Sequence, residues 1–169
     1  MVIRTARLVL RDMGEADLPG LASMLEDPVA MTHYEGPFSD GEVRGWLDRQ
    51  RRRYAEDGYG LWAVVGRESG ELLGQCGITW QDIGGEWRPE IGYHVKRAWW
   101  GYGYATEAAL ACRDYAFDEL GMGEVWAQVR DSNIASMNVA IRVGMTVRYR
   151  FVKMYRGVEM PHYAFSVRR

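Results

Sequence analysis

Cysteine, histidine and proline are scarce in this sequence of 169 residues, which has two, three and five of them, respectively. Cys76 and Cys112 are too few for the disulfide framework of a small secreted protein, so we expect a reducing, cytoplasmic location. His33, His94 and His162 are scattered along the chain without the spacing of metal ligands. A zinc site is therefore not expected, and neither is any other metal.

Charge and hydropathy exclude two further classes of partner. The chain has 21 basic and 23 acidic residues and a net charge of −2, so nucleic acid is not an expected partner. No apolar run approaches the ~20 residues that cross a membrane, and the first residues lack the apolar core of a signal peptide. The length and the 47% hydrophobic content favour one globular domain over residues 1–169.

Hydrophobic periodicity predicts a regular succession of strands and helices. The predicted strands cover 7–12, 61–66, 72–80, 87–96, 124–130, 147–155 and 161–167, and the predicted helices cover 15–26, a segment from Ser39 to before Gly58, 104–120 and 134–143. The strands on either side of the helix over 104–120 should be parallel, because a helical crossover joins them. This order predicts an α/β domain (α+β in some schemes) with a mixed, mostly antiparallel sheet of about seven strands flanked by helices.

Two of the predicted helices have distinctive faces. The helix over 104–120 has mainly alanines at its apolar positions, so it can lie close to a sheet. The helix that begins at Ser39 carries a run of arginines, which we interpret as a solvated face. These are Arg49, Arg51, Arg52 and Arg53.

The stretch RAWWGYGYATEAAL (97–110) places two glycines just before the start of a helix. The free N–H groups of residues 101–106 would surround the helix N-terminus and could bind an anion such as phosphate. The phosphate loop with a lysine is absent, and Thr106 stands where a dinucleotide fingerprint needs glycine or alanine. These residues alone support a generic tight turn and a phosphate-binding loop equally.

The longer stretch GYHVKRAWWGYGYATEAAL resembles the acetyl-CoA-binding signature of the GNAT N-acetyltransferases. The family pattern Arg/Gln-x-x-Gly-x-Gly/Ala falls on residues 100–105, where Trp100 replaces Arg or Gln, as is typical of the RimJ/RimL-like branch. Residues 133–145 resemble the Asn-x-x-Ser…Gly-Phe motif of that branch, and TARLVLRDMGEADLPGL resembles its N-terminus. The resemblance covers nearly the whole chain.

The resemblance implies a cleft between splayed central strands that binds the pantetheine arm of acetyl-CoA. The backbone of His94 and Val95 would pair with the pantetheine amides, and the glycine loop would wrap the pyrophosphate. Arg142 would approach the adenosine phosphate, or it would be an ordinary exposed helix arginine. The implied cofactor-binding residues are His94, Val95, Trp100, Gly101, Tyr102, Gly103, Tyr104, Ala105, Thr106, Asn133, Ser136, Asn138 and Arg142.

The implied reaction moves the acetyl group directly from the thioester to a primary amine of a protein N-terminus or a small molecule. The amine must be neutral to attack, which calls for a general base. Glu90 is the candidate base, with a surface or ion-paired glutamate as the alternative. A backbone N–H near Val95 would stabilise the oxyanion. The tyrosine that acts as the acid in many family members is replaced by Ala140. Ser136 is the substitute, unless its hydroxyl serves only as a cap or orients the cofactor, or the thiolate leaves unassisted.

The loop that follows the first predicted helix often shapes the acceptor site in this superfamily. His33, Tyr34 and Glu35 are therefore candidate acceptor-binding residues, or else ordinary loop surface. A non-catalytic acyl-CoA-binding or sensory protein is the alternative function, motivated by Ala140. A nucleotide-dependent oxidoreductase is disfavoured by the incomplete fingerprint. The sequence does not determine the acceptor or whether the chain forms a homodimer.

Overall fold

The computed structural model describes residues 2–155 and 157–169. In chain order the elements are β1 (Val2–Arg4), β2 (Leu8–Arg11), the short 3-10 helix η1 (Glu15–Asp17), α1 (Leu18–Leu25), α2 (Asp40–Glu56), β3 (Leu61–Gly66), β4 (Leu72–Ile83), β5 (Glu86–Val95), the 3-10 helix η2 (Arg97–Trp99), α3 (Tyr104–Asp118), β6 (Glu124–Arg130), α4 (Ile134–Arg142), β7 (Thr146–Tyr155) and β8 (Val158–Arg168). Among the described residues, no helix is long and apolar enough to cross a membrane.

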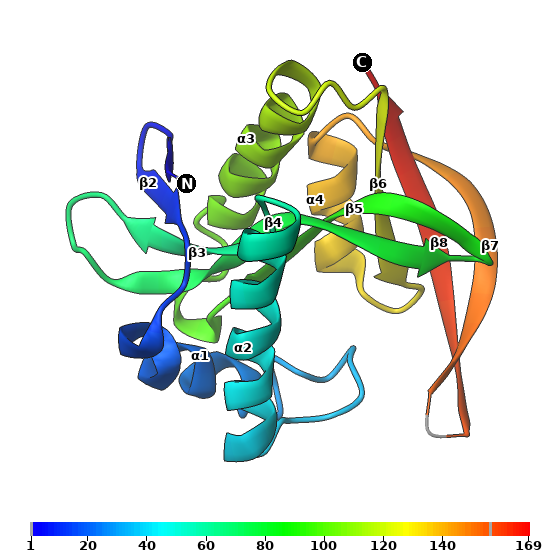
Figure 1. The fold of residues 1–169 in the computed structure, drawn as a ribbon. Coiled ribbons are helices and arrows are strands. Elements are labelled where there is room, and N and C mark those ends of the chain that lie inside the picture. Colours follow the sequence, from blue (N-terminus) through cyan, green and yellow to red (C-terminus); the bar gives the residue numbers. More distant parts are fainter. Residues whose placement is uncertain (1, 156) are drawn as a thin grey trace.

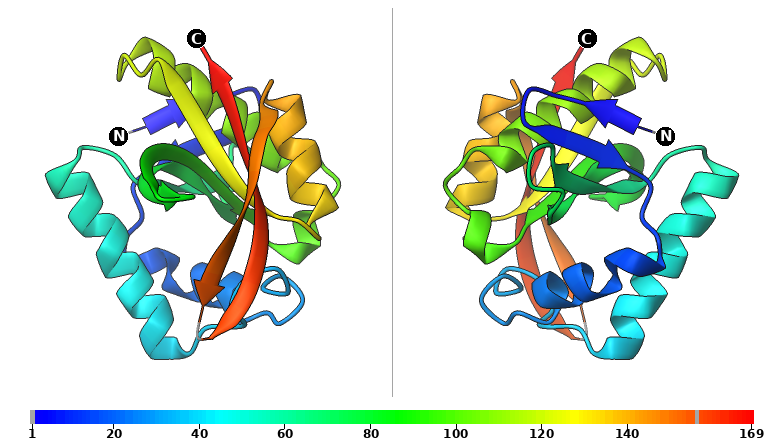
Figure 2. Two further views of the ribbon diagram at one scale, coloured as in Figure 1. Left: turned by 90° about the vertical axis from the view of Figure 1, so that its right-hand side faces the viewer. Right: turned by 90° about the vertical axis from the view of Figure 1, so that its left-hand side faces the viewer.

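One twisted sheet organises the domain, with strand order β1-β2-β3-β4-β5-β6-β8-β7 (Figure 1). Every neighbouring pair is antiparallel except β5 and β6, which α3 connects. Helices α1 and α2 lie on one side of the sheet, and α3 and α4 lie on the other (Figure 2). The predicted α/β architecture and the single parallel pair are therefore confirmed.

Three of the differences from the sequence prediction have a clear physical reason. The sheet has an eighth strand, β1, whose three residues are too few to show an alternating pattern. The predicted helix over 15–26 is divided, because Pro19 stands in the first turn of α1, where its missing N–H costs no hydrogen bond. Strand β8 begins before Pro161, and this proline is tolerated because it precedes the pairing of β8 with β6, which starts at His162.

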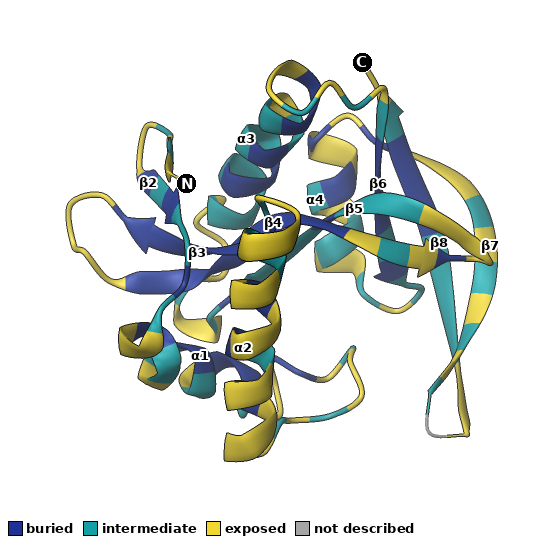
Figure 3. Cartoon of the chain, in the orientation of Figure 1, coloured by how far each residue is buried: buried dark blue, intermediate teal, exposed yellow. Residues whose placement is uncertain are grey.

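The central strands are largely buried (Figure 3), and their side chains alternate between two hydrophobic layers. On β3, Trp62 and Val64 pack into the layer under α3 and α4, whereas Ala63 and Val65 pack under α1 and α2. The buried face of α3 holds Ala108, Ala109, Cys112 and Ala116, all fully buried, which lets the helix lie close to the sheet as predicted. The thiol of Cys112 contacts that of Cys76, with 3.5 Å between the sulfur atoms.

The parallel strands β5 and β6 separate after a short contact. The register pairs only Glu90 with Trp126 between them, although both strands continue toward the glycine loop and α4. β4 stays paired with β5 as far as Val95. One edge of β5 is therefore open beyond Glu90, and this opening positions the site described next.

Candidate active site

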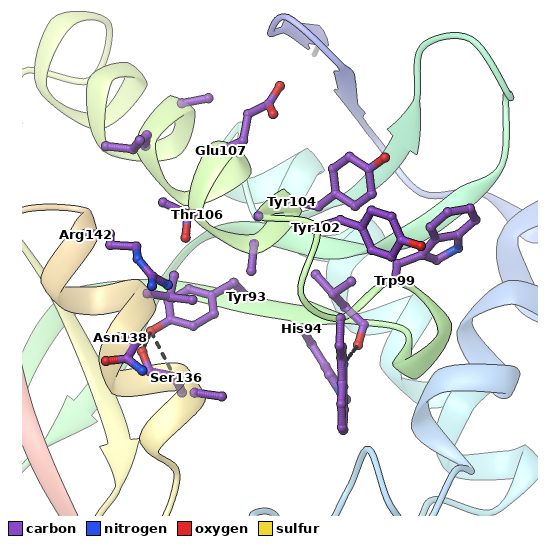
Figure 4. Close-up of a pocket in the computed structure, with 18 of the residues that line it drawn as sticks. Tyr93, His94, Trp99, Tyr102, Tyr104, Thr106, Glu107, Ser136, Asn138 and Arg142 are labelled. Atoms are coloured by element: carbon purple, nitrogen blue, oxygen red, sulfur yellow. Dashed lines mark hydrogen bonds between the residues drawn. The ribbon is translucent and has the colours of Figure 1, made fainter.

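A long cavity of about 1390 Å³ lies where β5 and β6 have separated, between the start of α3 and one face of α4 (Figure 4). Every residue that the resemblance assigned to the cofactor lines it: His94, Val95, Trp100, Gly101, Tyr102, Gly103, Tyr104, Ala105, Thr106, Asn133, Ser136, Asn138 and Arg142. The structure thus brings together segments that lie about 40 residues apart in the sequence. Asn133 also has a local role, since its Oδ1 accepts the Ser136 N–H at 3.1 Å and caps α4.

The glycine loop needs glycine for its backbone conformation. Gly101 and Gly103 have φ values of 83° and 81°, in the left-handed region that other residues avoid. A Cβ at Gly101 would meet no atom within 4 Å, and one at Gly103 would only approach the Arg7 guanidinium at 3.6 Å. The glycines therefore turn the chain so that the N-terminus of α3 faces the cavity, and they leave the space before it open.

Glu107 anchors this loop to the N-terminal strands. Its carboxylate accepts hydrogen bonds from the Thr5 hydroxyl at 2.6 Å and from Arg7 Nε at 2.6 Å. Arg7 also donates to the Tyr102 carbonyl at 2.9 Å. Burial opposes ionisation of Glu107, but these hydrogen bonds outweigh it and lower the pKa of the carboxyl group. Glu107 therefore has a structural role in holding the loop.

Trp100 occupies the position that Arg or Gln usually holds, and it also shapes the loop. Its indole Nε1 donates to the Val95 carbonyl at 2.7 Å, which ties the loop to the end of β5. In the same loop, the rings of Tyr102 and Tyr104 stack with 5.9 Å between their centroids, and Trp99 packs edge-on against both. This aromatic cluster stiffens a segment that contains two flexible glycines.

The pairing of β4 with β5 determines which backbone groups face the cavity. Lys96 N donates to Leu73 O, so by alternation His94 exchanges hydrogen bonds with Gln75, and the N–H and C=O of Val95 point toward the opening. The resemblance implied that the backbone of both residues would pair with a ligand. Val95 is therefore the one of the two whose backbone faces the cavity, where its C=O accepts the Trp100 Nε1–H, and His94 presents its side chain.

A small cavity of about 320 Å³ lies on the other side of β5, under the loop between α1 and α2. The candidate catalytic residues Glu90 and Ser136 line it, together with the candidate acceptor residues His33, Tyr34 and Glu35. The long and the small cavity share His33, Tyr34, Tyr93, His94 and Ser136. These residues form the junction at which ligands of the two cavities would meet.

Glu90 lies at the point where β5 and β6 separate, and its side chain faces the small cavity. Its carboxylate accepts hydrogen bonds from Gln128, from the backbone N at 3.3 Å and from Nε2 at 3.2 Å. Burial raises the pKa of Glu90, and the hydrogen bonds from Gln128 and the charges of Lys153 and Arg53 offset this only in part. A carboxylate with a raised pKa beside a cavity has the character of a general base.

Tyr93 is a functional candidate that the sequence reasoning missed. Its phenol donates to the Ser136 carbonyl at 2.8 Å and lies 3.1 Å from the Ser136 hydroxyl, which donates to it (Figure 4). Burial raises the pKa of this phenol, so it is protonated at neutral pH. Two features of the sequence could have pointed to Tyr93. It lies on the strand before the glycine loop, and position 140, where many family members have a tyrosine, is alanine.

His94 is held neutral at the junction. Its ring stacks on Tyr34 at 5.1 Å between centroids. It also forms a hydrogen bond with the Ala30 backbone, while Nε2 is buried without a partner among the described residues. Burial lowers the pKa of His94 from 6.5 to about 4.

This pKa predicts a specific loss of stability in acid. Between pH 6.5 and 4 the unfolded chain takes up a proton on His94 and the folded chain does not, so the free energy of unfolding falls. We expect this group to cost up to about 2 kcal/mol on going from pH 7 to pH 5. Urea titrations at both pH values should show a smaller decrease for His94→Gln than for the wild type. An identical decrease in both proteins would contradict this assignment.

The arginine run on α2 is not uniformly a solvated face, which corrects the sequence interpretation. Arg49, Arg51 and Arg52 are exposed, but Arg53 is partly buried and lines the small cavity. Lys153, from β7, lines the same cavity. Sequence spacing could not show that these two cations share a site with Glu90. In the described part of the chain, no three His, Cys, Asp or Glu side chains are grouped as metal ligands would be.

Comparisons with known proteins found relatives of this chain in sequence and in structure. The model of the acetyltransferase (GNAT) domain matches residues 7–146. The protein YkkB of Bacillus subtilis is 42% identical over 144 residues, 83% of each chain. The FsC-acetyl coenzyme A-N(2)-transacetylase of Aspergillus fumigatus is 30% identical over 99% of this chain and 76% of its own. The structure of RimL, a ribosomal-protein acetyltransferase in complex with coenzyme A, superposes with a TM-score of 0.80 at 18% identity, over 99% of this chain and 98% of that one.

Proposed function

The chain belongs to the GNAT acetyltransferase family, and from this premise we propose that it transfers the acetyl group of acetyl-CoA directly to a primary amine. One observation carries the proposal: the long and the small cavity meet at one junction, which Glu90 and the Tyr93–Ser136 pair flank from opposite sides of β5. The long cavity has the features of a donor site, with an open backbone edge and a helix N-terminus that suits phosphate. The small cavity would hold the acceptor.

Each step of the transfer has a candidate group in this chain. Glu90 removes a proton from the acceptor ammonium, directly or through water, so that the nitrogen lone pair can attack the thioester carbon. The Val95 N–H points toward the opening and is oriented to stabilise the developing oxyanion. A C–N bond then forms while the C–S bond breaks. The nitrogen releases its remaining extra proton to solvent, and the Tyr93 phenol gives a proton to the departing sulfur.

The Tyr93–Ser136 pair supplies the proton donor that Ala140 cannot. When the thiolate departs, the phenol gives it the proton that it otherwise donates to the Ser136 carbonyl. The Ser136 hydroxyl donates to the Tyr93 oxygen and stabilises the phenolate until a proton from solvent restores the phenol. Tyr93 comes from β5 and lines both cavities, so its phenol is at the junction. This arrangement makes Tyr93 the acid and Ser136 its partner.

Tyr93→Phe tests this role. We expect kcat at pH 7 to fall about 10- to 100-fold, because the departing thiolate loses its proton donor. The defect should shrink as the pH rises toward 9, since a thiol with a pKa near 8.5 then leaves readily as the thiolate. Ser136→Ala keeps the phenol and should have the smaller effect. Wild-type kcat for Tyr93→Phe at pH 7 would remove Tyr93 from the mechanism.

The overall function is tested by following release of the CoA thiol from acetyl-CoA. A panel of primary amines, amino acids and short peptides with free N-termini would be offered, and acetylated products would be identified by mass spectrometry. We expect amine-dependent thiol release with at least one class of acceptor. If no amine gives turnover while CoA still binds the protein, the proposed function is wrong.

A further inference from the structure

Two positively charged side chains from different elements line the small cavity. Arg53 comes from the last turn of α2, and Lys153 comes from β7. Both are partly buried, and the charges of both act on Glu90. A cation that lines a small cavity loses hydration, and this cost is recovered when an anion binds beside it.

Neither cation is in a direct ion pair among the described residues, although the charges of Asp57 and Glu90 both act on Arg53. Arg53 donates only to the neutral amide of Gln50, at 3.2 Å, and Lys153 is in none of the ion pairs of this part of the chain. By contrast, Arg44 and Arg51 on the same helix both pair with Glu15. The two cations in the cavity therefore lack the direct ion pair that Arg44 and Arg51 have.

The cavity also carries negative charge, but at separate places. Glu90 lies on β5 beside the junction, and Glu35 is exposed in the loop over the cavity. The remaining titratable groups of the lining include His33, His94 and His162, and the pKa values of the last two are lowered by burial. A ligand that complements this arrangement bears an amine toward Glu90 and an anion toward the two cations.

We propose that the acceptor is a small primary amine that also carries a carboxylate, with Arg53 and Lys153 binding the carboxylate while the amine lies at Glu90. This inference rests on the proposed function and adds the chemical class of the acceptor. A cavity of about 320 Å³ is at the lower end of small-ligand pockets and accommodates a molecule of amino-acid size. Arginine and lysine bind carboxylates through charge-assisted hydrogen bonds.

The experiment compares acceptors that differ only in the anionic group. L-Amino acids would be assayed for thiol release beside their α-amides and their decarboxylated amines, together with short peptides that present only a free N-terminus. We expect kcat/KM for at least one amino acid to exceed that of its amide about tenfold or more. Comparing the acid with its amide separates recognition of the carboxylate from recognition of the side chain.

Substitutions then test whether Arg53 and Lys153 cause the preference for the acid over its amide. Arg53→Gln and Lys153→Met should each lower the acid-to-amide ratio of kcat/KM about tenfold, mainly through KM of the acid. Arg53→Lys and Lys153→Arg keep the charge and should restore part of the ratio. Arg52→Gln removes an exposed charge from the neighbouring position on α2 and serves as the matched control. Thermal melts check that each variant is folded.

The outcomes separate this inference from the proposed function. Acetylation of peptide N-termini or of decarboxylated amines in preference to amino acids would overturn the inference and leave the proposed function in place. An acid-to-amide ratio that both neutral substitutions leave unchanged would also overturn it. Absence of turnover with every amine would instead count against the proposed function.

Discussion

Glu90→Gln is expected to lower kcat about 10²- to 10³-fold at pH 7. Glutamine has the size of glutamate and can still accept a hydrogen bond from Gln128, so the change removes the base with little disturbance of the strand. General-base catalysis typically contributes 10²- to 10⁴-fold, and the acceptor amine must lose a proton before it attacks. KM for acetyl-CoA should stay close to the wild-type value, because the donor lies in the other cavity.

The pH profile separates catalysis from structure at this residue. A base works only when deprotonated, so wild-type kcat/KM should rise with pH through the pKa of Glu90, which burial raises above the usual carboxyl range. The Gln variant should lack this acid limb. Glu86→Gln, at an exposed position on the same strand, is the control and should behave like the wild type. An unchanged acid limb in Glu90→Gln would assign the base to another group.

The second large effect is expected at the glycine loop. Gly101→Ala and Gly103→Ala should each weaken CoA binding about 5- to 30-fold. A left-handed conformation costs a residue with a Cβ about 1–2 kcal/mol, and the loop would relax away from the shape that presents its N–H groups to a phosphate. Isothermal titration calorimetry with CoA measures this directly.

Gly121→Ala is the matched control for the loop variants. Gly121 also has a positive φ, 64°, and open space around it, but it lies at the far end of α3 and does not line the long cavity. It should cost a similar amount of folding stability and leave CoA binding unchanged. If all three variants bind CoA as the wild type does, the loop does not form the phosphate site.

Much of the fold could be predicted because local patterns and tertiary structure agree. The alanine face of α3 indicated close packing on a sheet, and the crossover helix required β5 and β6 to be parallel. Strand β1 was not predicted, because three residues are too few to show the alternation of a strand. Its pairing with β2 depends on contacts made only in the folded chain.

The candidate site was partly predictable for a similar reason. Residues in the glycine loop and around Asn133 carry a pattern along the chain, so a resemblance could identify them. No such pattern marks Tyr93, Arg53 or Lys153. Their roles depend on which elements meet at β5 in the folded chain. Arg53 in particular looked like one more member of an exposed arginine run until α2 was placed over the small cavity.

Determining a crystal structure of the protein with bound CoA would test most directly the claim that the donor thioester lies at the junction of the two cavities. The account predicts the pyrophosphate at the N–H groups of residues 101–106 and the pantetheine arm beside Val95. The sulfur should lie at the junction, near the Tyr93 phenol and open to Glu90 through the small cavity. A sulfur atom far from this junction, or a pyrophosphate bound away from the glycine loop, would contradict it.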